Sequence, residues 1–169
     1  MAGVAERAGV STATLYRRWS SKQDLVVATV TTLVPDRARV DTGTLAGDLA
    51  AILSYAVNRF NGEGGRLTKG IIGETVRNPE LAAALRDKVL APRFDELVDV
   101  LARAAERGEI PPVANPRLAI SLILGPLHYR FLVTEEPLTA ELVDELLPLL
   151  LRAFRAAADA GEVGLGDRT

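Results

Sequence analysis

Two observations predict an all-α fold. Apolar residues recur at helical spacing along almost the whole chain, and the breaks between these stretches contain the residue types that cap helices. No run alternates apolar and polar residues long enough to indicate a strand. The chain has 169 residues, of which 48% are hydrophobic, so it is large enough for a small module joined to a larger globular domain.

Capping side chains mark where the helices begin. Asn78 and Asn115 each precede a proline, which suits the first helical position because the N–H it lacks would have no partner there. Ser21 and Asp24 have the spacing of a capping box. Further N-cap candidates are Thr44 and Thr139. We therefore expect helices at about residues 2–8, 12–18, 22–34, 44–61, 66–77, 79–107, 116–133 and 140–158.

Glycines and prolines mark helix ends and loops. Gly108 is placed to end the helix before it, and Pro92 is expected to kink the helix that contains it. We expect loops over residues 35–43 and 61–65, and a frayed tail over residues 161–169.

The first of these loops is the expected domain boundary. It separates an N-terminal domain, residues 1–36, from a C-terminal domain, residues 44–160. The net charge of the chain is -2, yet its first 34 residues contain four basic side chains (Arg7, Arg17, Arg18 and Lys22) against two acidic ones (Glu6 and Asp24). A basic N-terminal domain and an acidic remainder are compatible with a nucleic-acid partner for the first domain alone.

Composition excludes several classes of site. The chain has no cysteine and a single histidine, His128, so neither a disulfide framework nor a metal site of thiolates or several histidines is available. No nucleophile, acid and base fall into a recognisable catalytic arrangement. We therefore expect no enzyme, no metal and no cofactor.

The chain also lacks the signals of export and membrane insertion. Charged residues interrupt the N-terminus where a signal peptide needs an apolar core. The most apolar stretch, residues 118–133, is shorter than a bilayer span and contains His128 and Arg130. We expect a cytoplasmic protein with no membrane partner.

Residues 4–19 form the most informative pattern. Two helices that cross closely through a short turn need a small residue at the crossing and a residue that tolerates a left-handed conformation in the turn. Ala5 and Gly9 meet these needs, and Ser11 is placed to cap the second helix. Apolar contacts between the helices are expected from Val4, Val10, Leu15 and Trp19.

The second helix of this pair presents groups that suit the major groove of DNA. Hydroxyl, phenol and guanidinium groups bind phosphate oxygens and base edges. The exposed positions are expected to be Thr12, Ala13, Thr14, Tyr16, Arg17 and Arg18. The alternative is a plain helical hairpin, in which Tyr16 and Trp19 pack as core aromatics and the arginines are solvated.

Three phrases of this region resemble the tetracycline repressor (TetR) family: Ala8-Gly9-Val10-Ser11, Thr14-Leu15-Tyr16 and Ser21-Lys22-Gln23-Asp24-Leu25. Their combination is more specific than any one of them. The resemblance implies a helix-turn-helix DNA-binding domain followed by a helical ligand-binding and dimerisation domain. Residues 107–110, 125–130 and 137–139 are similar to the C-terminal domain of one subgroup.

The resemblance also implies which residues touch phosphates. Tyr16 and Lys22 would bind phosphate groups, as would the hydroxyl of Thr14 or of Ser11. Such contacts set the register of the protein on the duplex without reading its sequence.

Other positions of the same helix are implied to read bases. Arg17 is placed for a bidentate contact to a guanine, worth about 1–3 kcal/mol of discrimination. Arg18 fits either role, and Trp19 is assigned mainly to packing. The base-reading positions are Thr12, Ala13 and Arg17.

The sequence departs from the family pattern at its N-terminus. These repressors have a helix before the pair described above, whereas this chain begins almost inside the first helix of that pair. Without the preceding helix, Val4, Ala5 and Leu15 are expected to expose apolar area at a cost of about 25 cal/mol per Å². A misplaced start, a clipped chain and a genuine loss of DNA affinity are all open explanations.

The last two expected helices are apolar on nearly all sides. Such helices need cover on two sides, which a two-fold dimer provides by packing the pair against its mate. That dimer would also space two recognition helices for half-sites one helical turn apart. The alternative is an ordinary core inside a monomer. Expected interface residues are Leu122, Leu127, Phe131, Leu146, Leu147, Leu150 and Phe154.

A ligand pocket is expected among the helices between Leu45 and Val133. Such pockets are lined by apolar side chains with a few polar groups. Each candidate has the alternative of being plain core, and a lone histidine near a proline is commonly a satisfied structural group. The candidates are Tyr55, Arg59, Thr75, Phe94, Leu101, Ile120, Leu124 and His128.

Together these features predict a ligand-responsive transcriptional regulator, a repressor, that binds palindromic double-stranded operator DNA as a homodimer. We expect a small-molecule effector in the C-terminal domain to shift the helix that begins at Lys22 and so to change the separation of the two DNA-binding domains. The alternative is a small-molecule-binding or dimerisation module whose DNA-binding domain is vestigial, and its main support is the missing first helix.

Overall fold

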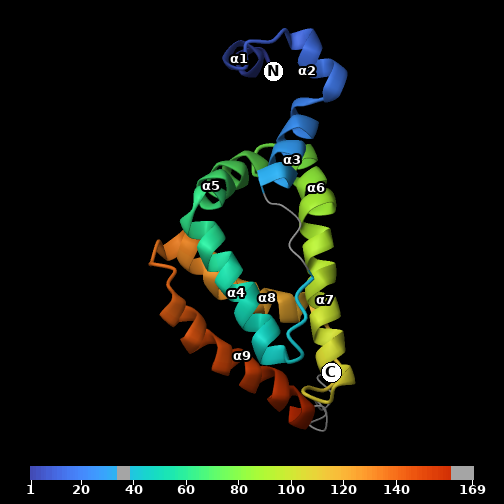
Figure 1. The fold of residues 1–169 in the computed structure, drawn as a ribbon, viewed down its shortest axis with the longest axis vertical. Helices are drawn as coiled ribbons and strands as arrows, with labels where there is room; N and C mark the ends of the chain where they lie inside the picture. Colours follow the sequence, from blue (N-terminus) through green and yellow to red (C-terminus); the bar gives the residue numbers. More distant parts are fainter. Residues whose placement is uncertain (34–38, 161–169) are drawn as a thin grey trace, which may run out of the picture. The chain divides into compact units, whose positions relative to one another are not determined.

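The computed structural model describes residues 1–33 and 39–160, with the backbone alone described at residue 33 and over residues 157–160. The described part is helical and contains no strand, as predicted. Its α-helices, labelled in Figure 1, are α1 (Ala2–Arg7), α2 (Thr12–Arg18), α3 (Lys22–Leu33), α4 (Leu45–Asn61), α5 (Glu63–Thr75), α6 (Pro79–Leu85), α7 (Ala91–Glu106), α8 (Pro116–Tyr129) and α9 (Ala140–Ala160). Two π-helical turns, η1 (Arg86–Leu90) and η2 (Arg130–Thr134), follow α6 and α8.

Parts of two predictions lie outside the described residues. These are positions 34–38, which include the first four residues of the first predicted loop, and the predicted tail over residues 161–169.

The predicted helix caps are confirmed where the structure describes them. The side chain of Asn78 accepts a hydrogen bond from the N–H of Leu81 at 3.0 Å, and that of Asn115 accepts one from Leu118 at 3.1 Å. The hydroxyl of Thr44 accepts from the N–H of Gly47 at 3.1 Å. Each cap satisfies one N–H that the first turn of a helix leaves without a partner.

The predicted loop over residues 61–65 is wrong in part, because α5 begins at Glu63. Its glycines indicated a loop, yet Gly65 is buried at a close approach of two elements. A Cβ added at Gly65 would collide with the backbone carbonyl of Phe60 and touch the ring of Phe131. The absence of a side chain therefore serves packing here rather than a flexible turn.

The long helix predicted over residues 79–107 is interrupted before Pro92. The N–H of Ala91 donates to the carbonyl of Arg86, one residue further back than in an α-helix, at the end of η1. Proline lacks an N–H, and its ring crowds the carbonyl four residues earlier. A π-helical turn next to it is one way in which a helix accommodates that disruption.

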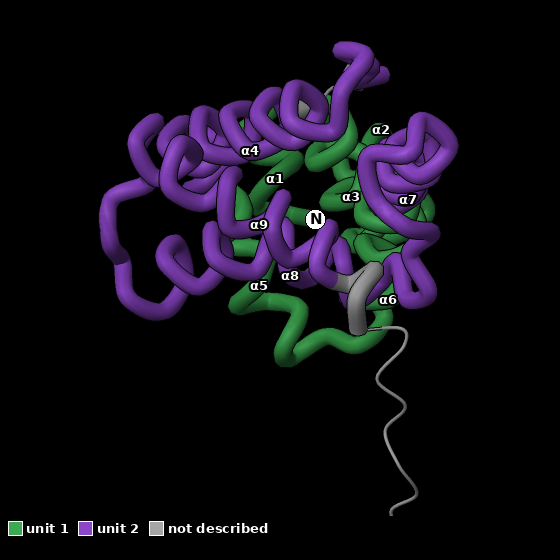
Figure 2. The backbone as a smooth tube through the Cα atoms, turned by 90° about the horizontal axis from the view of Figure 1, so that it is seen from below, with its two compact units in different colours: residues 1–36, 67–92 green, residues 37–66, 93–169 purple. Residues whose placement is uncertain are grey.

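The chain forms two compact units, which Figure 2 colours separately. Unit 1 consists of Met1–Asp36 and Leu67–Pro92, and unit 2 of Arg37–Arg66 and Arg93–Thr169. Unit 1 therefore joins the expected DNA-binding domain to a stretch that the sequence placed in the C-terminal domain. Helices α5 and α7 each run from one unit into the other along the chain.

The core of unit 1 lies between α3, α6 and η1. Val27 and Val30 of α3 pack with Leu81 and Leu85 of α6 and with Val89 of η1. These five side chains fix α3, the helix that begins at Lys22, on the rest of the unit.

The core of unit 2 is larger and continuous. It collects buried side chains from α4, α7, α8 and α9, among them Leu49 and Leu53 of α4, Val100 of α7, and Ile123 and Leu127 of α8, none of which has more than a trace of exposed surface. Helix α4 packs along α9 and contacts α8, so α4 has its apolar face covered by both C-terminal helices.

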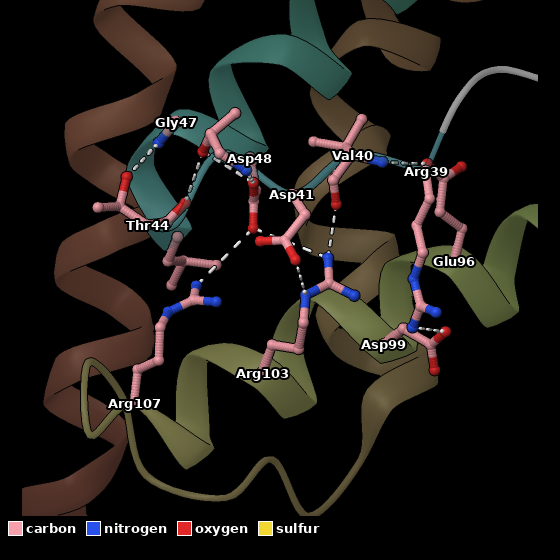
Figure 3. Close-up of polar contacts among 12 residues, drawn as sticks. Arg39, Val40, Asp41, Thr44, Gly47, Asp48, Glu96, Asp99, Arg103 and Arg107 are labelled. Carbon is pink, nitrogen blue, oxygen red and sulfur yellow. Dashed lines mark hydrogen bonds and ion pairs between the residues drawn. The ribbon is translucent and has the colours of Figure 1, made fainter.

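A polar cluster joins the start of α4 to the end of α7 within unit 2, as Figure 3 shows. Asp48 is fully buried, and its Oδ1 accepts hydrogen bonds from the N–H and the hydroxyl of Thr42 at 2.6 and 2.8 Å. Its Oδ2 lies 3.9 Å from Nη2 of Arg103 and 3.8 Å from Nη2 of Arg107. Two guanidinium groups thus face one buried carboxylate and compensate its charge.

A neighbouring carboxylate extends this cluster. Burial raises the pKa of Glu109, but the hydrogen bond from the N–H of Leu45 and the contact with Arg107 outweigh burial, and the pKa of Glu109 is lowered overall. Glu109 therefore stays ionised at the N-terminus of α4, where an anion is favoured.

Candidate nucleic-acid interface

The turn between α1 and α2 has the geometry that the sequence predicts. Gly9 adopts the left-handed conformation with a φ of 64°, and the N–H of Val10 donates to the carbonyl of Ala5 at 3.0 Å. This is the Schellman arrangement, which ends a helix on a glycine. The side chain of Ser11 then caps α2 by accepting from the N–H of Thr14 at 3.1 Å.

The packing of α1 and α2 is only partly as expected. Ala5 and Leu15 are buried, so the predicted exposure of these two side chains is wrong. Val4 is 47% exposed, which confirms the predicted exposure of this side chain, while Val10, which was expected to pack between the helices, is 40% exposed. The small side chain of Ala5 lets the two helices approach each other.

The face of α2 opposite Leu15 is open to solvent. The side chain of Tyr16 is 53% exposed, which excludes its packing as a core aromatic. The other predicted DNA-contacting positions of this helix are also exposed: Ser11, Thr12, Ala13, Thr14, Arg17 and Arg18. The helix therefore exposes two guanidiniums, a phenol and several hydroxyls to solvent.

The hydroxyl groups at the start of α2 interact with each other. Oγ of Ser11 and Oγ1 of Thr14 lie 2.9 Å apart, and Oγ of Ser11 also accepts from the backbone of Thr14. Ser11 is therefore engaged as the cap of α2, and its hydroxyl is paired with that of Thr14.

Trp19 and Arg18 contact each other at the end of α2. The ring of Trp19 is half-buried, and the guanidinium carbon of Arg18 lies 5.2 Å from its centroid. A cation over an indole at this distance is an attractive contact. This contact holds the Arg18 side chain beside Trp19, and Arg18 remains exposed at the surface.

Lys22, the remaining predicted DNA contact, is the first residue of α3. The turn before it is organised by Ser21, whose hydroxyl accepts from the N–H of Asp24 at 3.0 Å. Hydrogen bonds from Ser20 and Ser21 lower the pKa of Asp24, and Lys88 of η1, whose Nζ lies 3.6 Å from Oδ1 of Asp24, adds to the effect. The side chain of Lys22 is 63% exposed, and its ammonium lies near Glu74 of α5.

Seven of the eight predicted ligand contacts belong to unit 2, and Thr75 belongs to unit 1. Leu101 and Ile120 are buried members of the core, while Tyr55, Arg59, Phe94, Leu124 and His128 are half-buried. The ligand-binding role of the set stays a prediction.

An aromatic residue that the sequence analysis did not select joins several of these candidates. The ring of Phe60 stacks on Phe131 at 4.6 Å, meets His128 edge-on at 5.1 Å, and lies 5.6 Å from the guanidinium carbon of Arg59. Its signal in the sequence is its place on the apolar stripe of α4, one turn after Val57.

Two polar groups beside Phe60 have defined environments. Nδ1 of His128 donates to the carbonyl of Leu124 at 2.9 Å, which is the bond of a satisfied structural histidine. Burial lowers the pKa of Arg59, and the positive charge of Arg93 lowers it further, while Tyr55 opposes both.

The predicted dimer-interface residues differ in how far they are exposed. Leu127, Leu146, Leu150 and Phe154 are buried within the protomer, Phe131 and Leu147 are half-buried against the same core, and Leu122 is exposed. The buried side chains cover α4, which is the neighbour that the helical pattern alone did not identify. The dimer role of the seven stays a prediction.

No helix in the described ranges, residues 1–33 and 39–160, combines the length and the apolarity needed to cross a membrane.

Two family models match this chain. Residues 1–29 match the model of bacterial regulatory proteins of the tetR family, and residues 39–150 match that of the tetracyclin repressor-like C-terminal domain. The first match covers α1, α2 and most of α3, and the second covers most of unit 2 together with residues 67–92 of unit 1.

Several known proteins are similar over most of their length. An HTH-type transcriptional regulator of Bacillus subtilis, YdeS, is 28% identical over 92% of this chain and 79% of its own. The DNA-binding transcriptional repressor TetR of Mycobacteroides abscessus is 30% identical over 90% of this chain and 83% of its own. The crystal structure of the TetR family transcription regulator SCO0332 superposes with a TM-score of 0.73 at 30% identity, covering 88% of this chain and 83% of that one.

The matches at both ends of the chain favour a regulator over a binding module with a vestigial DNA-binding domain. This chain belongs to the TetR family of helix-turn-helix transcriptional regulators.

Proposed function

We propose that this regulator is a repressor that reads a palindromic operator through the exposed face of α2. Tyr16 and Lys22 bind phosphates and fix the register, and Arg17 contacts a base edge in the major groove. The observation that carries the proposal is the exposure of this face, since groups packed in the interior would not reach a duplex.

We propose that two copies of the chain pair through α8 and α9. Leu118, Leu122 and Tyr129 are exposed and share one face of α8, because four and eleven residues bring a helix back to nearly the same direction. Leu149 is exposed on α9. A row of exposed apolar side chains on a helix is stabilised when a second copy covers it. Of the seven interface residues predicted from the sequence, Leu122 is the one whose side chain is exposed.

The effector of the proposed repressor binds in unit 2, next to Phe60. The aromatic rings of Phe60 and Phe131 offer an apolar surface, and Arg59 and Tyr55 supply polar groups beside it. Binding there shifts the helix that begins at Lys22 and changes the separation of the two DNA-binding domains. A regulator of this kind acts on the chromosome, and we place it in the cytoplasm.

Fluorescence anisotropy with a duplex from the region upstream of the gene tests the DNA contacts. Lys22→Ala is expected to weaken binding for every sequence and to reduce the slope of log K against log salt by about one per protomer. Tyr16→Phe removes one hydrogen bond to a charged phosphate and is expected to weaken binding roughly tenfold. Wild-type affinity and slope in both variants would contradict the proposal.

A matched control for charge is Arg66→Ala. Arg66 is an exposed cation of unit 2 whose ion pair with Glu63 is long, at 3.5 Å. The proposal expects wild-type DNA affinity in this variant, so a loss equal to that of Lys22→Ala would show that net charge, rather than position, governs binding.

Analytical ultracentrifugation tests the pairing. Leu122→Glu places a charge on the exposed row of α8 and is expected to convert a dimer into a monomer. Val76→Glu introduces the same charge at a position that is 83% exposed and outside α8 and α9, and it is expected to leave the dimer intact. A dimer that survives Leu122→Glu would rule out this interface.

A further inference from the structure

The ammonium of Lys22 already has an acidic partner within unit 1. Nζ of Lys22 donates to Oε1 of Glu74 at 3.4 Å, although the two residues are 52 positions apart in the sequence. The side chain of Lys22 is 63% exposed and that of Glu74 is 44% exposed. The pair is therefore accessible to solvent and to a competing anion.

The acid nearest to Lys22 in sequence is committed to another partner. Asp24 accepts hydrogen bonds from the hydroxyls of Ser20 and Ser21, and its Oδ1 lies 3.6 Å from Nζ of Lys88 in η1. Two ion pairs thus connect the first turn of α3 to its neighbours. Lys22 pairs with Glu74 of α5, and Asp24 pairs with Lys88 of η1. Among the described residues, Glu74 is the acid that contacts Lys22.

A DNA phosphate and the carboxylate of Glu74 would both bind the ammonium of Lys22. An ammonium is a compact point charge on a flexible stem, and it gains most from one anion at close range. A carboxylate left beside a DNA phosphate would also repel it. Binding of DNA must therefore draw Lys22 away from Glu74 or accept two like charges around one cation.

We infer that Glu74 is a positioning residue that competes with DNA phosphate for Lys22 and so lowers the affinity of this regulator for DNA. The inference rests on the proposed phosphate contact of Lys22. Glu74 lies in the last turn of α5, whose first residues, Glu63–Arg66, belong to unit 2. A displacement of α5 against α3 changes the strength of this competition.

A double-mutant cycle, measured by anisotropy with the same upstream duplex, tests the inference. Glu74→Gln keeps the size of the side chain and removes its charge. It is expected to tighten DNA binding about two- to fivefold at low salt, the range that an exposed ion pair can supply. The gain is expected to shrink as salt is raised, because salt screens the competing pair in the free protein.

Two controls separate this competition from the general effect of removing a negative charge. Glu80→Gln, at an exposed position of α6 in the same unit, makes the same change in net charge and is expected to tighten binding less than Glu74→Gln. In the Lys22→Ala background, Glu74→Gln is expected to give no more than the Glu80→Gln effect, because its partner is gone.

The outcomes distinguish the inference from the proposed function. If Lys22→Ala leaves DNA affinity and salt slope unchanged, the proposed phosphate contact fails and the inference falls with it. If Lys22→Ala weakens binding, but Glu74→Gln has no effect or the same effect with and without Lys22, the phosphate contact stands and the competition is overturned. A twofold or larger gain that depends on Lys22 and declines with salt supports it.

Discussion

The two compact units bury apolar side chains to very different extents. Unit 2 has one continuous core built from α4, α7, α8 and α9, whereas α1 and α2 of unit 1 each bury a single side chain, Ala5 and Leu15. The helices of unit 2 are held by many mutual contacts, and those of the DNA-binding hairpin by a few. The difference teaches that stability and DNA recognition are located in different places and are separable by mutation.

The largest effect is expected from the core of unit 2. Leu53→Ala removes a side chain with no exposed surface and is expected to lower the free energy of unfolding by about 2–5 kcal/mol, because the cavity cannot fully collapse. Denaturant unfolding followed by circular dichroism measures this loss.

Leu15→Ala is the counterpart in unit 1. It is expected to abolish DNA binding and to raise amide hydrogen exchange in α1 and α2, while the protected amides of α4 and α9 keep their rates. Equal acceleration in both units would break the comparison, since it would mean that the hairpin and the core unfold together.

The buried carboxylate of unit 2 is expected to have the next largest effect. Asp48→Asn keeps an oxygen for Thr42 but removes the buried charge that faces Arg103 and Arg107, and we expect a loss of about 2–3 kcal/mol in the free energy of unfolding. Thermal unfolding measures it.

A matched control for Asp48 lies in the same unit. Asp99 forms a shorter ion pair with Arg39, at 2.7 Å, but both side chains are more than half exposed. Asp99→Asn is expected to cost less than about 1 kcal/mol, because solvent screens the pair. A larger loss for Asp99→Asn than for Asp48→Asn would show that distance outweighs burial in this protein.

Two glycines of α5 allow a smaller test across the two units. Gly65→Ala, on the unit 2 side, forces its new methyl group against the carbonyl of Phe60 and is expected to destabilise the protein by about 1–3 kcal/mol. Gly73→Ala, on the unit 1 side, meets no atom and is expected to stabilise it by about 0.5–1 kcal/mol, because alanine favours the helix. Opposite signs in thermal unfolding are the expected result, and equal signs would contradict the packing of Gly65.

The smallest effect is expected at the cap of α2. Ser11→Ala removes the acceptor for the N–H of Thr14 and is expected to weaken α2 by about 1 kcal/mol, seen as faster hydrogen exchange in that helix. Ser54→Ala, an exposed hydroxyl in the middle of α4, is the control and is expected to change stability by less than about 0.5 kcal/mol. Unchanged exchange in α2 would mean that Leu15 alone holds the helix.

Local chemistry was predictable from the sequence. The caps at Asn78 and Asn115, the left-handed Gly9 and the exposed face of α2 each depend on residues within one turn of one another, and the structure has them as expected. The family could be identified for the same reason, because its most specific phrases lie in one short hairpin.

Features that depend on distant residues were not predictable in this way. The helical pattern of α9 shows that Leu146 and Leu150 are apolar, but only the position of α4 decides that they face the protomer core rather than a second copy. Gly65 appeared to be a loop residue because its close approach to the carbonyl of Phe60 depends on how α4 and α5 pack, which the sequence pattern does not show. The pairing of Lys22 with Glu74 was not predictable either, because the two residues are 52 positions apart in the sequence.

The central claim is that the exposed face of α2 reads DNA, and Arg17 tests it most directly. The measurement is a selection of binding sites from random duplexes with the wild type and with Arg17→Ala. The account predicts an inverted repeat for the wild type and, for Arg17→Ala, a lost preference at one base pair in each half-site, since a bidentate contact to guanine is worth about 1–3 kcal/mol. An Arg17→Ala variant that selects the wild-type sequence at every position would contradict it.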